Sequence, residues 1–204
     1  MNIKELKQSI EGVDIYILDQ ILKDRYQQDA IILDAGCGKG RNLRWFYQNN
    51  YTFYGVDHSE SAIETVRKEY PKMALNFSIQ NLDNLSFQNG FFDHILCNAV
   101  LHFAQHKAHF IHMFSELIRV LKPGGSLFMR MTSLEGIEEY ANHQGNGVYF
   151  LPDKTYRFLL NPVLLEELLD NYPIKLIEAL KTVKVANLRC MSTLVFQKNN
   201  ATAL

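Results

Sequence analysis

The 204-residue chain has few cysteines, almost no net charge and no long apolar run. Cys37, Cys97 and Cys190 are too few and too scattered to form a disulfide framework or a zinc site, so no bound metal is expected. A formal net charge of −1 gives no electrostatic footprint for nucleic acid. No segment has the length and composition of a membrane span or a secretory leader. We therefore expect a cytoplasmic protein that binds neither membrane nor nucleic acid.

The most informative segment is residues 31–42, where an apolar run ends in Asp34 and then turns through three glycines. This order predicts a strand, a glycine loop and a helix start, which is the local architecture of a nucleotide-type cofactor site. The dinucleotide signature requires glycine or alanine where this chain has Arg41, and a pyrophosphate would be repelled by Asp34. A ligand with ammonium and sulfonium groups, such as S-adenosylmethionine, would instead be attracted.

A second acid follows at the end of the next predicted strand, residues 51–57. A carboxylate at Asp57 can accept hydrogen bonds from both hydroxyls of a ribose. The alternative is a solvated aspartate at a strand end, which is common. Two acids at the ends of consecutive strands, on either side of a glycine turn, favour the ligand-binding interpretation.

Hydrophobic periodicity predicts alternating strands and helices, which is typical of a parallel, doubly wound α/β sheet. Strands are expected over 31–34, 52–56, 74–79, 92–97 and 126–131, and helices over 13–26, 41–49, 59–69 and 106–121. The first helix is expected to place Val13, Ile17, Leu18, Ile21 and Leu22 on one face. After residue 131 we expect a long irregular polar insertion over 132–157, then a helix over 161–169. Two closing strands are expected over 174–185 and 190–197.

Five segments in this order resemble the motifs of class I S-adenosylmethionine-dependent methyltransferases, and the resemblance covers about residues 30–131. They are residues 33–40, 54–59, 80–87, 92–98 and 119–127. The Gly40-Arg41-Asn42 continuation is also similar to tellurite-resistance-type methyltransferases. The resemblance implies a Rossmann-like, mostly parallel seven-stranded sheet with an antiparallel edge strand and helices on both faces. It also implies one domain over 1–204, with a helical cap over 1–29 and the 132–157 insertion on the substrate side.

The resemblance also implies residue roles for S-adenosylmethionine as the cofactor. The backbone of Gly36, Cys37 and Gly38 would face the methionine part, Asp34 would favour its ammonium, and Asp57 would hold the ribose. Near the adenine, His58 would stack, or it is an exposed histidine at a helix start. Asn81 replaces the usual acid and can accept from the adenine amine, while the Leu82 amide would meet a ring nitrogen. Nearby Asp83 would compensate, or is a solvated loop acid.

Other candidates lie where the sulfonium and the acceptor would meet. Asn98 follows the fourth strand, and Tyr16 would contact the cofactor from a helix that acts either as a lid or as a plain packing helix. His102 is the candidate that would orient or deprotonate the acceptor, or else it is a structural histidine. Arg130 would bind an anionic substrate or form a salt bridge, and Tyr149 in the insertion would offer a ring and a hydroxyl.

Three histidines recur at three-residue spacing in the predicted helix over 106–121: His106, His109 and His112. This spacing resembles a metal site, but no acid or cysteine nearby in the sequence completes a ligand set. We therefore expect them to face solvent.

The function that follows is methyl transfer from S-adenosylmethionine to a small-molecule acceptor by in-line displacement. One alternative is a protein or RNA methyltransferase, although the lack of a basic surplus argues against RNA. The other is a non-catalytic cofactor-binding sensor or partner subunit. Tight cofactor binding without any methyl transfer would favour the last.

Overall fold

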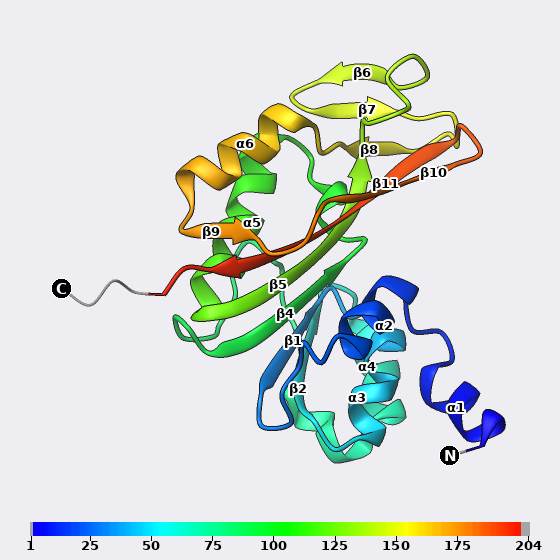
Figure 1. The fold of residues 1–204 in the computed structure, drawn as a ribbon, viewed down its shortest axis with the longest axis vertical. Helices are drawn as coiled ribbons and strands as arrows, with labels where there is room; N and C mark the ends of the chain where they lie inside the picture. Colours follow the sequence, from blue (N-terminus) through cyan, green and yellow to red (C-terminus); the bar gives the residue numbers. More distant parts are fainter. Residues whose placement is uncertain (1, 201–204) are drawn as a thin grey trace.

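The computed structural model describes residues 2–200 and is built around a central eight-stranded sheet (Figure 1). The strand order is β10-β11-β5-β4-β1-β2-β3, with β9 paired to β11. Neighbours among β1 to β5 run parallel, whereas β11 runs antiparallel to β5, β9 and β10. The strands are β1 Ile31–Ala35, β2 Thr52–Asp57, β3 Phe77–Ile79, β4 Phe92–Asn98, β5 Leu121–Ser133, β9 Ile174–Leu176, β10 Lys181–Val185 and β11 Arg189–Lys198. The mostly parallel α/β architecture predicted from the sequence is confirmed.

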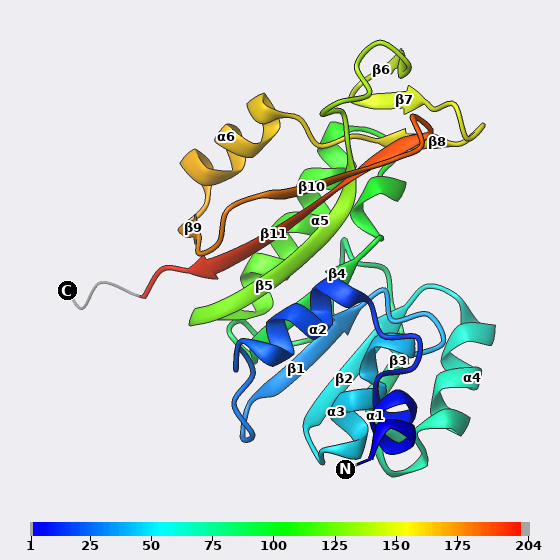
Figure 2. The ribbon, with the colours of Figure 1, turned by 45° about the vertical axis from the view of Figure 1, so that its right-hand side comes forward.

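Helices cover both faces of this sheet because its central strands are apolar on both sides (Figures 1 and 2). Ile32, Leu96 and Phe128 belong to the core beneath α2, α3 and α4. Their chain neighbours Leu33, Ile95 and Leu127 belong to the core beneath α5 and α6. The helices are α1 Ile3–Ile10, α2 Ile15–Leu22, α3 Arg44–Gln48, α4 Glu60–Glu69, α5 Lys107–Val120 and α6 Pro162–Asn171, and short 3-10 turns lie at Arg41–Leu43, Pro71–Asn76 and Leu101–Phe103.

Side-chain caps set the starts of the helices that flank the site. Ser59 accepts a hydrogen bond from the Ala62 amide at 3.3 Å and so begins α4, as predicted. His106 caps α5 through its ring, which accepts from the His109 amide at 3.1 Å. No helix among residues 2–200 has the length and apolar character needed to cross a membrane.

The insertion after β5 is not irregular, which corrects the sequence-based expectation. It contains a separate three-stranded antiparallel sheet beyond the end of β5, made of β6 Asn142–Gly145, β7 Val148–Phe150 and β8 Tyr156–Phe158 (Figure 1). The turn between β6 and β7 uses Asn146 and Gly147, both with positive φ, which is typical of a tight hairpin. The polar composition of this segment reflects its exposed faces rather than a lack of regular structure.

Other element boundaries also differ from the prediction, and the strand expected over 126–131 is longer, covering Leu121–Ser133. The helix expected over 13–26 covers only Ile15–Leu22, and it buries Gln20 while leaving Leu22 exposed. The strand expected over 74–79 starts at Phe77, because Pro71–Asn76 forms a 3-10 turn. The strand expected over 174–185 is interrupted and forms β9 and β10, which gives the main sheet eight strands rather than seven.

Candidate functional site

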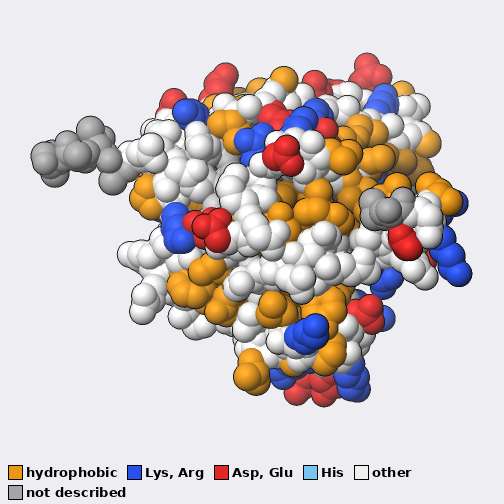
Figure 3. Space-filling view, turned by 60° about the horizontal axis from the view of Figure 1, so that its bottom comes forward, with side chains coloured by type: hydrophobic (Ala, Val, Ile, Leu, Met, Phe, Trp, Pro, Cys, Tyr) orange, Lys and Arg blue, Asp and Glu red, His pale blue; other side chains and the backbone are white. Residues whose placement is uncertain are grey.

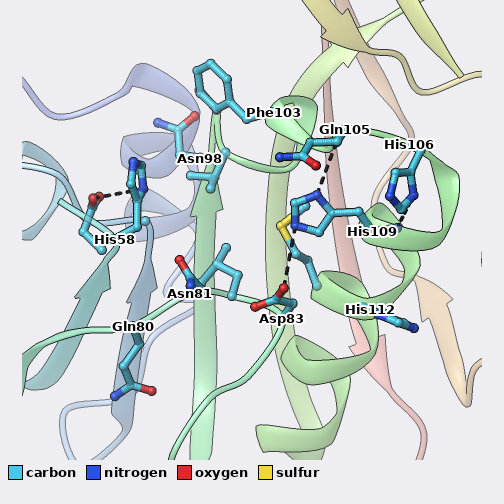
Figure 4. A pocket seen from close by; sticks show the side chains of 16 residues that line it. His58, Gln80, Asn81, Asp83, Asn98, Phe103, Gln105, His106, His109 and His112 are labelled. Carbon is cyan, nitrogen blue, oxygen red and sulfur yellow. Dashed lines mark hydrogen bonds and ion pairs between the residues drawn. The ribbon is translucent and has the colours of Figure 1, made fainter.

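A cavity of about 870 Å³ opens at the carboxyl ends of β1, β2 and β4, where ligands of open α/β sheets bind (Figure 4). Its volume is within the range of small-molecule sites. The glycine loop, the turn after β3, the turn after β4 and the first half of α5 all contribute to its wall. The lining residues are Gly36, Asp57, His58, Gln80, Asn81, Leu82, Asp83, Asn98, Ala99, Val100, Phe103, Gln105, His106, His109, His112 and Met113.

The glycine loop is held against the end of β2 by its own backbone. The amides of Gly36 and Cys37 both donate to the Val56 carbonyl, at 2.8 and 2.9 Å. Gly36 has a φ of +80°, and a Cβ at this position would meet Val100 Cγ2 at 2.4 Å. Only glycine fits this backbone conformation and this space. The close approach places the loop beside Asp57.

Asp57 is fixed at the rim of the cavity by two backbone donors. Its Oδ2 accepts from the Gly38 amide at 2.8 Å, and its Oδ1 accepts from the Ser59 amide at 2.9 Å. Each carboxylate oxygen has a second lone pair and can accept one further bond. The next side chain, His58, is 83% exposed, with Nδ1 at 3.5 Å from Asp57 Oδ1. The carboxylate is therefore oriented before any ligand arrives.

Two buried polar side chains at the strand ends lack hydrogen-bond partners among residues 2–200. They are Asp34, through Oδ2, and Asn98, through both Oδ1 and Nδ2. Leaving such a group unpaired in the interior costs about 1–3 kcal/mol, so buried polar atoms are almost always satisfied. Asn98 lines the cavity directly. The Asn98 amide is therefore available to a polar group of a ligand, whereas Asp34 is fully buried and is not among the lining residues.

Asp34 is also electrostatically unusual. Burial raises the pKa of its carboxyl to about 7, the charge of Arg41 lowers it in part, and the charge of Asp57 raises it. A carboxyl poised near neutrality can be ionised by a cationic ligand group placed beside it. The same arrangement makes the stability of the protein depend on pH.

Replacing Asp34 with asparagine tests this arrangement. Because the folded pKa is raised, the unfolded chain releases the proton first, and wild-type stability falls as pH rises from about 4 to about 7. We expect the wild type to lose about 3 kcal/mol relative to Asp34→Asn between pH 5 and pH 8. Urea unfolding of both proteins at these two pH values measures the difference. A stability difference that does not change with pH would contradict the assignment.

The turn after β3 and helix α5 face each other across the cavity. Asn81, Leu82 and Asp83 line one side, and Asp83 Oδ2 lies 3.9 Å from His109 Nε2 on the other. The second ring nitrogen of His109 accepts from the Gln105 amide at 3.2 Å. Asp83 and His109 thus form an ion pair across the cavity when the histidine is protonated.

His106 and His112 are exposed, as expected from the sequence, and His109 is half-buried beside Asp83. All three also line the open cavity, which the sequence did not indicate. Their regular spacing was visible in the sequence, but the turn that faces them is more than twenty residues away. Among residues 2–200, no group of three or more histidine, cysteine or acidic side chains is arranged to hold a metal ion.

His102 lies outside the cavity lining and is buried behind it. Its Nδ1 is 2.9 Å from the Thr132 hydroxyl and accepts from the Thr132 amide at 3.3 Å. Burial lowers the pKa of His102 to about 4, and the charges of nearby arginines lower it as well. These contacts tie the turn after β4 to the end of β5.

Replacing His102 with asparagine, which keeps an acceptor for the Thr132 amide, should change the acid response of stability. A lowered folded pKa means that the unfolded chain takes up the proton first, so wild-type stability falls as pH drops from about 6.5 to about 4. At pH 5 this loss is about 2 kcal/mol, and it is absent from His102→Asn. Urea unfolding at pH 7.5 and pH 5 checks it. Parallel pH dependence in the two proteins would refute the prediction.

Arg130 and Tyr16 contact each other rather than the cavity. The Arg130 guanidinium lies 5.1 Å from the centre of the Tyr16 ring, and its Nη1 is 3.6 Å from Asp14 Oδ2. The salt-bridge alternative for Arg130 is thus present in the structure. Tyr149 lies on β7, packs against the apolar cluster under the small sheet, and has its ring 4.8 Å from that of His143.

Comparisons with known proteins agree with this architecture. Residues 33–129, from the end of β1 into β5, match the family model described as "Methyltransferase domain". An uncharacterised methyltransferase of Schizosaccharomyces pombe is 30% identical over 122 residues, which cover 59% of this chain and 83% of that protein. The chain belongs to the class I S-adenosylmethionine-dependent methyltransferases. It is therefore an enzyme of methyl transfer, with S-adenosylmethionine as its cofactor.

Two further similarities describe the range of this methyltransferase's relatives. A mouse protein named probable tRNA methyltransferase 9B is 29% identical over 116 residues, or 57% of this chain and 24% of that protein. A crystal structure of an S-adenosylmethionine-dependent methyltransferase from Methanosarcina mazei has a TM-score of 0.74 at 21% identity, covering 89% of this chain and 98% of that one. The second similarity concerns the fold alone.

Proposed function

We propose that this methyltransferase acts on a small-molecule acceptor that enters the cavity described above. The observation that carries the proposal is that Gly36, Asp57, Asn81 and Asn98 line one cavity of about 870 Å³ with the first half of α5. Such a volume is within the range of small-molecule sites.

The cofactor fits the residues present, beginning at the methionine end. The backbone of Gly36, Cys37 and Gly38 would allow close approach, and the carboxyl of Asp34 would favour an ammonium group. Asp57, oriented by its two backbone donors, accepts the ribose hydroxyls through its remaining lone pairs.

The adenine end of the cofactor would be held mainly by side chains rather than by the glycine loop. Asn81, which lines the cavity, would offer its side-chain oxygen to the exocyclic amine, and the Leu82 amide would meet a ring nitrogen. The ring of His58 is 83% exposed beside Asp57 (Figure 4) and would stack on the base. Asn98, with an unpartnered amide, would contact the ligand where cofactor and acceptor meet.

When bound, S-adenosylmethionine supplies an activated methyl group, which moves to the acceptor atom while the carbon–sulfur electron pair stays on sulfur. The protein's task is then alignment and exclusion of water. We assign His102, Arg130 and Tyr149 to positioning, because each is held by protein partners outside the cavity lining. Tyr16 would contact the cofactor only if α2 shifts from its Arg130 contact.

RNA is the competing acceptor, since one relative carries the name of a tRNA methyltransferase. On the face shown in Figure 3, lysine and arginine side chains are interspersed with acidic ones. A net charge of −1 likewise offers little attraction for a phosphate backbone. Both observations favour the small-molecule acceptor.

A labelling experiment distinguishes these acceptors. The enzyme is incubated with methyl-labelled S-adenosylmethionine and, in separate reactions, a filtered metabolite extract, total RNA or the protein fraction of a cell extract. Asp57→Ala is the control with weakened cofactor binding. Label in the metabolite fraction supports the proposal, whereas label confined to RNA or to protein overturns it. Tight S-adenosylhomocysteine binding without labelling of any fraction would indicate a non-catalytic binding protein.

A further inference from the structure

Phe103 is an unusual side chain for the rim of an open cavity. It belongs to the 3-10 turn after β4, it is 59% exposed, and it lines the cavity on the side of Asn98 (Figure 4). Large aromatic side chains contribute most when they are covered, and their faces prefer other rings or cations. The turn nevertheless holds this ring outward, because His102 beside it is buried and bonded to Thr132.

One part of the Phe103 ring is covered by a cation from the small sheet. The Arg157 guanidinium lies 4.7 Å from the ring centre, and its Nη1 donates to the Tyr156 carbonyl at 2.7 Å. Among residues 2–200, no acidic side chain forms an ion pair with Arg157. Its charge is therefore not neutralised locally.

The other arginines near this turn differ in this respect. Arg130 is close to Asp14, and Arg189 lies 3.5 Å from Asp153. Phe103 and the unpartnered amide of Asn98 thus line one end of the cavity, and the uncompensated charge of Arg157 lies over the Phe103 ring from outside the lining. An aromatic ring suits a planar ring of a ligand, and a positive charge with an amide suits an acidic hydroxyl group.

We propose that Phe103, Arg157 and Asn98 form the acceptor subsite for a planar aromatic molecule that bears an acidic hydroxyl group. The ring of the acceptor stacks on Phe103, and its hydroxyl is bonded by the Asn98 amide. The positive charge of Arg157 favours the ionised hydroxyl, which is the better nucleophile. This inference rests on the proposed function and specifies the substrate class of the same site.

The chemistry balances without another reactant. The hydroxyl first loses its proton to water, and the resulting oxygen anion forms a bond to the methyl carbon. The carbon–sulfur bond breaks with its electron pair on sulfur, so the sulfonium charge and the oxygen charge disappear together. An aliphatic alcohol ionises far less readily and cannot stack, so it would use neither Phe103 nor Arg157.

Binding of matched probes tests the subsite without requiring turnover. The protein saturated with S-adenosylhomocysteine is titrated with 2-naphthol, 4-nitrophenol and 8-hydroxyquinoline, and with the saturated analogues decahydro-2-naphthol and cyclohexanol, using saturation-transfer NMR. We expect the aromatic probes alone to bind. Phe103→Ala should weaken their binding at least fivefold, and Phe103→Trp should retain it. Arg157→Gln should weaken binding of ionised 4-nitrophenol more than that of neutral 4-nitroanisole.

Tyr140→Ala is the matched control, because Tyr140 is also exposed and lies 5.2 Å beneath a cation, Lys184, but is outside the cavity lining. Equal binding of aromatic and saturated probes, or equal effects of Phe103→Ala and Tyr140→Ala, would overturn the subsite. Failure of the small-molecule function itself gives a different result: S-adenosylhomocysteine still binds, and label appears in RNA or protein.

Discussion

Asp57→Ala is expected to weaken binding of S-adenosylhomocysteine by about 10- to 150-fold. A hydrogen bond to a charged group contributes about 1.5–3 kcal/mol, and here the carboxylate accepts from the ligand while it also holds the Gly38 and Ser59 amides. Its removal therefore loosens both the ribose contact and the glycine loop. Isothermal titration calorimetry on the purified variant measures the change.

Glu60→Ala is the matched control for this experiment. Glu60 is an exposed carboxylate three residues further on, at the first position of α4, and it does not line the cavity. Its removal changes the net charge equally and should leave the affinity near the wild-type value. If Asp57→Ala remained folded by circular dichroism and bound with wild-type affinity, the ribose assignment would be wrong.

Gly36→Ala is expected to destabilise the protein by about 2–5 kcal/mol and to reduce cofactor affinity. The left-handed conformation costs a residue with a Cβ about 1–2 kcal/mol, and the clash with Val100 adds about 1–3 kcal/mol. Val100 lines the cavity, so its displacement alters the shape of the binding site. Urea unfolding gives the stability, and calorimetry gives the affinity.

Gly38→Ala separates the cost of the left-handed backbone conformation from the cost of the steric clash with Val100. Gly38 also has positive φ, but a Cβ there would meet no atom within 4 Å. It should therefore lose only the conformational contribution, about 1–2 kcal/mol. Val100→Ala in the Gly36→Ala background should restore part of the stability. Equal destabilisation by the two glycine substitutions would show that the contact with Val100 has no energetic role.

Local signals explain what the sequence could predict. Ser59 is followed at once by the helix it caps, and Asp57 ends an apolar strand, so both could be placed from their immediate neighbours. The left-handed glycine at position 36 likewise follows from a tight turn between a strand and a helix. The main parallel sheet was predictable because each of its strands is a short apolar run between polar turns.

Other features depend on partners far away in the chain. The burial of Gln20 and the exposure of Leu22 reflect where α2 lies on the sheet, where Gln20 Oε1 accepts from Arg25. The α5 histidines face a cavity because the turn carrying Asp83 packs opposite them. The polar residues of β6 to β8 form a sheet only through pairing with one another, and periodicity over three- or four-residue strands is too short to detect.

The thirteen-residue strand β5 pairs within the main sheet and also anchors the segment that holds the small sheet. Its first part pairs with β4 in the main sheet, and its last residue, Ser133, bridges to Leu160 just after the small sheet. The Thr132 carbonyl accepts from the Leu160 amide at 3.0 Å, so both ends of the 134–160 segment leave and rejoin the domain at almost one point. A change of length or sequence within this segment would therefore leave the pairing of β5 with β4 and β11 intact.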